Sequence, residues 1–153
     1  MELTTLSVIV GAAGTCALGG IFPWIAAEAV ILATALAVPA SAFPLLAVSC
    51  AVGQMTGKAG LYGIIRWAPA RLPERFQRLI GRAEVLGRRP GALTGSVLSG
   101  AAVGLPPLYV VTLAAGLAHL SLVRFLVAGL LGSAIRYGVL LWGAGAVGLG
   151  GFS

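Results

Sequence analysis

The chain has 153 residues, of which 59% are hydrophobic and 23 are glycine, whereas only 9% are charged. Soluble domains carry about 25% charged residues, and a soluble domain of this size has too little interior to hide so much apolar surface. The composition therefore excludes a cytosolic enzyme and favours an integral membrane protein. The formal net charge of +6 does not indicate nucleic acid binding, because no basic face is interspersed with aromatic residues.

The charged residues are unevenly placed. Eight lie between Arg71 and Arg89, and the others are Glu2, Glu28, Lys58, Arg66, Arg124 and Arg136. We predict a single membrane domain over residues 1–153, with apolar halves at 3–66 and 91–150 around a basic segment. Because positive residues are retained on the cytoplasmic side, we expect residues 66–90 in the cytoplasm.

The first half predicts two spans around a proline-broken segment. Leu6–Phe22 is long enough for a short span and Phe43–Trp67 for a full one, since a span needs about 20 apolar residues. Residues 22–41 contain Pro23 and Pro39, and neither piece beside these prolines is long enough to cross alone. Broken backbone at membrane depth must be shielded by protein or line a wet cavity. We therefore predict a re-entrant helical hairpin at 22–41.

Residues 70–89 predict an amphipathic helix. Apolar residues recur at helical spacing from Leu72 to Leu86, and arginines occupy the other faces. We expect this helix to lie on the anionic cytoplasmic leaflet. Its membrane-surface residues are Arg71, Arg75, Arg78, Arg82, Arg88 and Arg89.

The second half repeats the plan of the first. Pro106 and Pro107 divide an apolar stretch into two short pieces, predicting a hairpin at 92–117, and a span runs from about Leu120 to Trp142. Residues 57–65 and 132–140 share Gly, Ala, Tyr and Gly in register. Interrupted segments at corresponding places in two halves are typical of transporters built from inverted repeats. The expected fold is an all-α integral membrane protein with two re-entrant helical hairpins, several transmembrane helices and one interfacial amphipathic helix.

Several motifs occur in a fixed order over residues 20–142. They are Pro23 with Glu28, the pattern G-x-x-x-x-Y-x-x-x-R at Gly57, Tyr62 and Arg66, the stretch G-L-P-P-L-Y-V-V-T-L-A-A-G, and then Phe125, Gly132 and Arg136. This arrangement resembles the DedA family, also called the SNARE-associated or VTT-domain family, and within it the short bacterial YqaA-like members.

The resemblance implies two re-entrant hairpins facing each other in a bacterial inner membrane. It also implies movement of undecaprenyl phosphate or other phospholipids, in some relatives coupled to protons. Lys58 stands where relatives often have an Asp, and Val103 and Tyr109 stand where many have arginines. Proton coupling is therefore left open.

Three charged residues within apolar segments have two interpretations each, because such groups face a cavity or a partner. Glu28 is a titratable acid or headgroup clamp, or else a structural partner for Lys58 or an arginine. Lys58 holds a phosphate or neutralises Glu28. Arg136 contacts a phosphate or serves as the counter-ion of Glu28.

The remaining candidate residues line the same expected cavity. Arg66 is a phosphate contact or an interfacial anchor, Tyr62 and Tyr109 are hydrogen-bonding walls or interfacial tyrosines, and Gln54 adds a polar contact. The chain has no Asp and one His, so we expect no enzyme, cofactor or metal site. Cys16 and Cys50 are expected to be packed thiols.

Three functions follow from these residues. The first is a lipid transporter, flippase or scramblase that moves a phospholipid or polyprenyl-phosphate headgroup along a polar path between the hairpins. The second is a proton-coupled exporter of a small solute or cation that uses Glu28, and the third is a non-transporting membrane scaffold. The expected partners are anionic membrane lipids and, because there are few full spans, a second copy of the chain.

Overall fold

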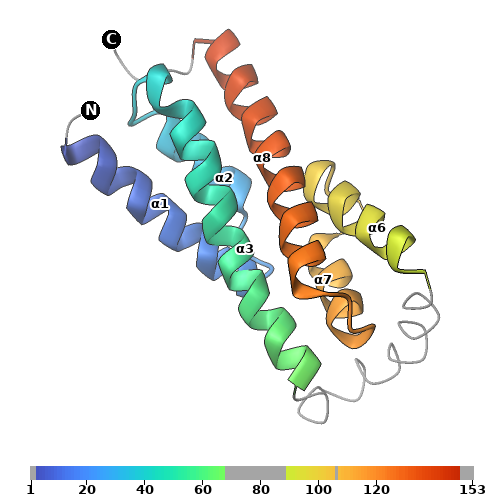
Figure 1. Cartoon of the computed structure of the whole chain (residues 1–153). Helices are drawn as coiled ribbons and strands as arrows, with labels where there is room; N and C mark the ends of the chain where they lie inside the picture. Colours follow the sequence, from blue (N-terminus) through green and yellow to red (C-terminus); the bar gives the residue numbers. More distant parts are fainter. Residues whose placement is uncertain (1–2, 68–88, 106, 149–153) are drawn as a thin grey trace. The chain divides into compact units, whose positions relative to one another are not determined.

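The computed structural model describes residues 3–67, 89–105 and 107–148, which are helical and contain no strand (Figure 1). The helices are α1 (Leu3–Ile21), α2 (Ala27–Ala35), the short 3-10 helix η1 (Ala40–Ala42), α3 (Phe43–Trp67), α6 (Pro90–Ala102), α7 (Leu108–Leu117) and α8 (Leu122–Ala146). The described part of the chain is therefore all-α, as the sequence predicts.

Three helical segments are long and apolar enough to cross a membrane: Leu3–Ile21, Ala40–Trp67 and Leu122–Ala146. They coincide with the three spans predicted from the sequence, and α3 has the predicted bounds. Their length and composition make this chain a membrane protein. Residues 70–88 of the amphipathic helix predicted at 70–89, including Arg71, Arg75, Arg78, Arg82 and Arg88, lie outside the described residues.

Each half contains a pair of packed helices, α1 with α2 and α6 with α7. The second pair covers almost the predicted range of 92–117, whereas 22–41 contains the single α-helix α2, which packs against α1. The chain turns back onto α1 at Gly19, where a Cβ would lie 2.9 Å from the Ile25 carbonyl oxygen. The re-entrant character of both hairpins stays a prediction.

The predicted prolines lie between helices. Pro23 is in the turn between α1 and α2, Pro39 precedes η1, and Pro107 is the N-cap of α7. Each of these prolines lies outside a helix interior, so its missing N–H leaves no helical hydrogen bond unformed. Pro106 lies outside the described residues.

The helices pack as two compact units. The first unit comprises residues 1–57 with 133–153, and the second comprises 58–132. The first unit contains the α1–α2 hairpin and the second contains the α6–α7 hairpin, while α3 and α8 contribute residues to both. The units therefore differ from the sequence halves 3–66 and 91–150, because each combines one hairpin with parts of both long helices.

The matched glycines of the sequence repeat each lie at a close helix–helix contact, one in each unit. In the first unit, a Cβ on Gly57 would collide with the carbonyl oxygen of Ala17 on α1. In the second, a Cβ on Gly132 would lie 2.6 Å from the carbonyl oxygen of Leu98 on α6. Small residues let membrane helices approach closely, so each glycine brings a long helix against the first arm of a hairpin.

Candidate functional site

An ion pair links the short helix α2 to α8 within the first unit. The Glu28 Oε1 and Arg136 Nη2 atoms are 2.7 Å apart, and both side chains are 31% exposed. Glu28 lies in the first turn of α2, whose N-cap, Ala26, supplies no side-chain hydrogen bond. A carboxylate near a helix N-terminus interacts favourably with the helix dipole, so the first turn of α2 is a suitable place for Glu28.

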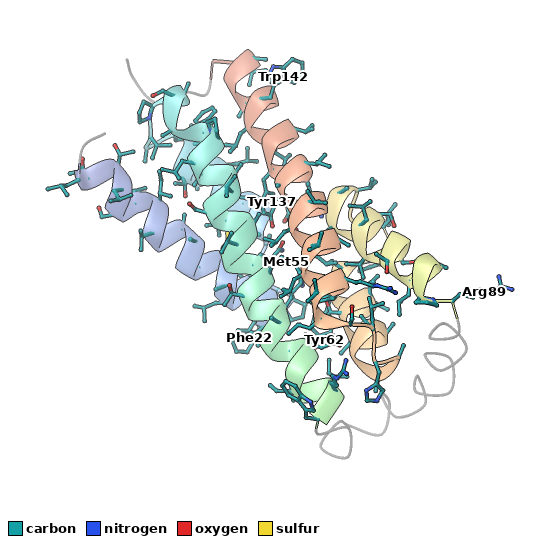
Figure 2. The ribbon with its side chains drawn as sticks, in the orientation of Figure 1. Phe22, Met55, Tyr62, Arg89, Tyr137 and Trp142 are labelled. Carbon is teal, nitrogen blue, oxygen red and sulfur yellow. The ribbon has the colours of Figure 1, made fainter. Side chains whose placement is uncertain are left out.

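A polar cluster joins α3 to α8 in the same unit. The Tyr137 hydroxyl donates to Gln54 Oε1 at 2.6 Å, and the Ser133 hydroxyl donates to the same oxygen at 3.4 Å. Tyr137 is completely buried and Ser133 is 1% exposed. Figure 2 shows Tyr137 where α8 faces α3. The cluster holds α8 at a fixed rotation against α3.

The side chains that α8 supplies to these contacts lie on one face. Ser133, Arg136 and Tyr137 are three and four residues apart, which places them on the same side of a helix. Residues on the other side, such as Ile135 and Val139, are largely exposed and apolar. The buried Tyr137 therefore orients the neighbouring Arg136 toward α2.

The second unit contains a different polar cluster at the end of α3. The Tyr62 hydroxyl donates to the Leu120 carbonyl oxygen, and Arg66 Nη1 donates to that hydroxyl at 2.6 Å and to the carbonyl at 3.1 Å. The Tyr62 ring stacks on Phe125 with a centroid distance of 5.1 Å, and Figure 2 shows Tyr62 on the lower part of α3. The two side chains thus fasten α3 to the connection between α7 and α8.

That connection is a tight helix cap. The Leu120 N–H donates to the Ala115 carbonyl and the His119 N–H to the Gly116 carbonyl, the two bonds of a Schellman motif. His119 has a φ of 53°, a left-handed conformation that glycine adopts more easily. The cap aims the Leu120 carbonyl at Tyr62 and Arg66.

The structure brings some of the predicted site residues together. Glu28 meets Arg136, which is the counter-ion arrangement considered from the sequence, and Gln54 contacts Tyr137. Arg66 and Tyr62 meet each other in the second unit, and their shared carbonyl favours the anchor interpretation of Arg66.

The other predicted residues lie elsewhere along the helices. Lys58 belongs to the second unit and is only 4% exposed, Tyr109 is half-buried on α7, and Arg89 is the exposed N-cap of α6. Among the described residues, no group of three or more His, Cys, Asp or Glu side chains is placed to hold a metal ion. The two cysteines are free and buried, as expected of packed thiols.

Sequence reasoning missed two functional groups. Ser133 lies one turn before Tyr137 within the repeated segment 132–140, so the sequence could have placed the two side chains on the same helix face. The Leu120 carbonyl gave no signal, because every residue has a carbonyl group.

Comparison of the chain with models of protein families, with curated proteins and with solved structures finds no match. The resemblance to the DedA family therefore stays a prediction.

Proposed function

We propose that this chain moves lipid headgroups across a bacterial inner membrane, as a flippase or scramblase of DedA type. The observation that carries the proposal is the Glu28–Arg136 ion pair, in which both side chains stay 31% exposed in a unit built from apolar helices. An Arg or Asp at the centre of a membrane helix costs about 2.5–3.5 kcal/mol on insertion scales. A partly exposed pair is therefore best explained by contact with water or with polar headgroups.

The chemistry of the pair suits a phosphate-bearing headgroup. A guanidinium has five N–H donors in a planar fork, so Arg136 keeps donors for a phosphate while one of its nitrogens contacts Glu28. The negative charge of Glu28 partly cancels the positive charge of Arg136, so a phosphate would bind Arg136 weakly enough to dissociate again. The broken backbone before α2 resembles the discontinuous helices that form binding sites in transporters.

In this proposal the headgroup passes the ion pair while the acyl chains stay in the bilayer. Tyr137, Gln54 and Ser133 hold α8 in place beneath the pair and do not touch the lipid. Arg66 and Tyr62 keep the second unit folded. Neither cofactor nor covalent chemistry is required, in keeping with a transporter and not an enzyme.

The test is lipid translocation in proteoliposomes with a fluorescent phospholipid and a membrane-impermeant quencher. We expect Glu28→Gln and Arg136→Gln each to lower the translocation rate at least about tenfold, because each removes one charge of the pair. Arg89→Gln is the matched control, since Arg89 is exposed and outside the pair, and it should keep the wild-type rate. Wild-type rates in both pair variants would overturn the proposal.

One alternative function predicts a different result in the same vesicles. A proton-coupled solute exporter would show pH-dependent solute uptake that is lost in Glu28→Gln, with no lipid translocation in the wild-type protein. That outcome would replace the lipid proposal by the exporter.

A further inference from the structure

A groove of about 440 Å³ lies between α6 and α8 within the second unit. Gly95 and Leu98 form its α6 wall, and Val127, Ala128 and Leu131 form its α8 wall. Ligand sites typically have volumes of about 300–1,000 Å³, so the groove is large enough for part of a lipid chain.

The groove follows from the packing of the two helices. They touch at Gly132, which approaches Leu98 and Ala101, and the groove lies toward the N-terminal end of α8 from this contact. Gly95 leaves it open, because a Cβ at that position would meet nothing within 4 Å. The Thr94 hydroxyl adds no free donor to the wall, since it donates to the Pro90 carbonyl of its own helix.

Among the described residues, Arg124 is the one charged side chain in the lining. It is exposed and makes no ion pair with any described residue. Leu131, on the same helix, lies seven residues beyond it, about 10 Å along the axis. A bilayer core of about 30 Å has leaflets of about 15 Å, so the groove spans most of one leaflet with its cation at one end.

The guanidinium of Arg124 selects the headgroup, because it is the charge that the described part of the lining presents. A zwitterionic headgroup would bring its ammonium group close to the Arg124 guanidinium, whereas an anionic headgroup brings only negative charge to it. Figure 2 shows Arg89 at the start of α6, pointing away from the helix.

We infer that this groove retains one anionic glycerophospholipid, whose acyl chain lies along α6 and α8 and whose phosphate pairs with Arg124. The bound lipid fills the space between the helices as a structural component. The inference does not rest on the proposed function, because it requires retention of a lipid and not its movement across the membrane.

The test is native mass spectrometry of the full-length protein in mild detergent, with added dioleoyl phosphatidylglycerol or dioleoyl phosphatidylcholine. We expect one phosphatidylglycerol per chain, retained at least about tenfold better than phosphatidylcholine. Gly95→Leu should fill the groove, and Arg124→Gln should remove its cation. Each should lower phosphatidylglycerol retention about tenfold without unfolding the protein, because Gly95 has open space around it and Arg124 is exposed.

Two matched controls separate the groove from general effects. Gly91→Leu adds the same side chain to open space on α6 outside the lining, and Arg89→Gln removes an equal charge. Both should retain phosphatidylglycerol as the wild type does. Equal retention of the two lipids by the wild type, or wild-type retention by either Gly95→Leu or Arg124→Gln, would overturn the inference, as would an equal loss in the controls.

Discussion

The two units share a packing plan but use their polar side chains differently. In both, a matched glycine brings a long helix against a hairpin, and a matched tyrosine is buried (Tyr62 and Tyr137). In the second unit, the arginine beside the tyrosine bonds to that tyrosine and to a backbone carbonyl. In the first, the arginine next to the tyrosine forms an ion pair that is 31% exposed. The two units therefore share their close helix packing, and the partly exposed ion pair of the first unit marks the candidate site.

The largest expected effect tests the shared part of this comparison. Gly57→Val in the first unit and Gly132→Val in the second would drive a side chain into a backbone carbonyl, which no rotamer change relieves. We expect each to destabilise the protein by about 3 kcal/mol, the upper end for overpacking, measured by thermal unfolding in detergent. Gly60→Val and Gly138→Val are the controls on the same helices, where a Cβ meets nothing within 4 Å. Equal destabilisation by variant and control would show that the close approaches are absent.

A smaller effect separates the two tyrosines. The Tyr62 hydroxyl donates to Leu120 and accepts from Arg66, whereas the Tyr137 hydroxyl makes one hydrogen bond, to Gln54. Hydrogen bonds between membrane helices contribute about 0.6 kcal/mol on average, with a maximum of about 1.7. Tyr62→Phe should therefore cost about 1–2 kcal/mol and Tyr137→Phe about 0.6 kcal/mol in the same unfolding assay. A larger loss of stability in Tyr137→Phe than in Tyr62→Phe would contradict the assignment of the additional hydrogen bond to Tyr62.

The smallest effect concerns the cap that presents the Leu120 carbonyl. His119 has a left-handed backbone, which costs a residue with a side chain about 1–2 kcal/mol relative to glycine. Glycine at position 119 would remove this cost, but it would also raise the conformational entropy of the unfolded chain, which offsets part of the gain. We therefore expect His119→Gly to stabilise the protein by about 0.5 kcal/mol. Ala118→Gly, at a φ of −78°, should instead destabilise it. A loss of stability in His119→Gly would mean that the cap differs from the one described.

Much of this fold follows from the sequence. Hydropathy and the flanking prolines predict α3, α8 and the α6–α7 pair, because a membrane span needs a long apolar run and a proline interrupts it. Hydropathy also predicts α1 as a span, and a re-entrant hairpin at 22–41 stays a prediction. The packing of α1 against α2 involves a close approach of Ile25 to Gly19, which no hydropathy pattern contains.

The candidate site was predicted only in part. Glu28 and Arg136 were identified because a charge in an apolar segment needs a partner, and one of the partners considered for Glu28 was an arginine. The role of Arg66 depends on the Leu120 carbonyl, and the orientation of α8 depends on three side chains meeting at Gln54. Such contacts join residues more than fifty positions apart, so local spacing carries no information about them.

The central claim is that the first unit carries the transport site while the second provides structural support. The most direct test compares Arg136→Gln with Arg66→Gln by measuring lipid translocation per folded protein in proteoliposomes. The account predicts a loss of at least about tenfold in Arg136→Gln with little change in stability, and a wild-type rate in Arg66→Gln with a lower unfolding temperature. A wild-type rate in Arg136→Gln together with a lost rate in folded Arg66→Gln would contradict it.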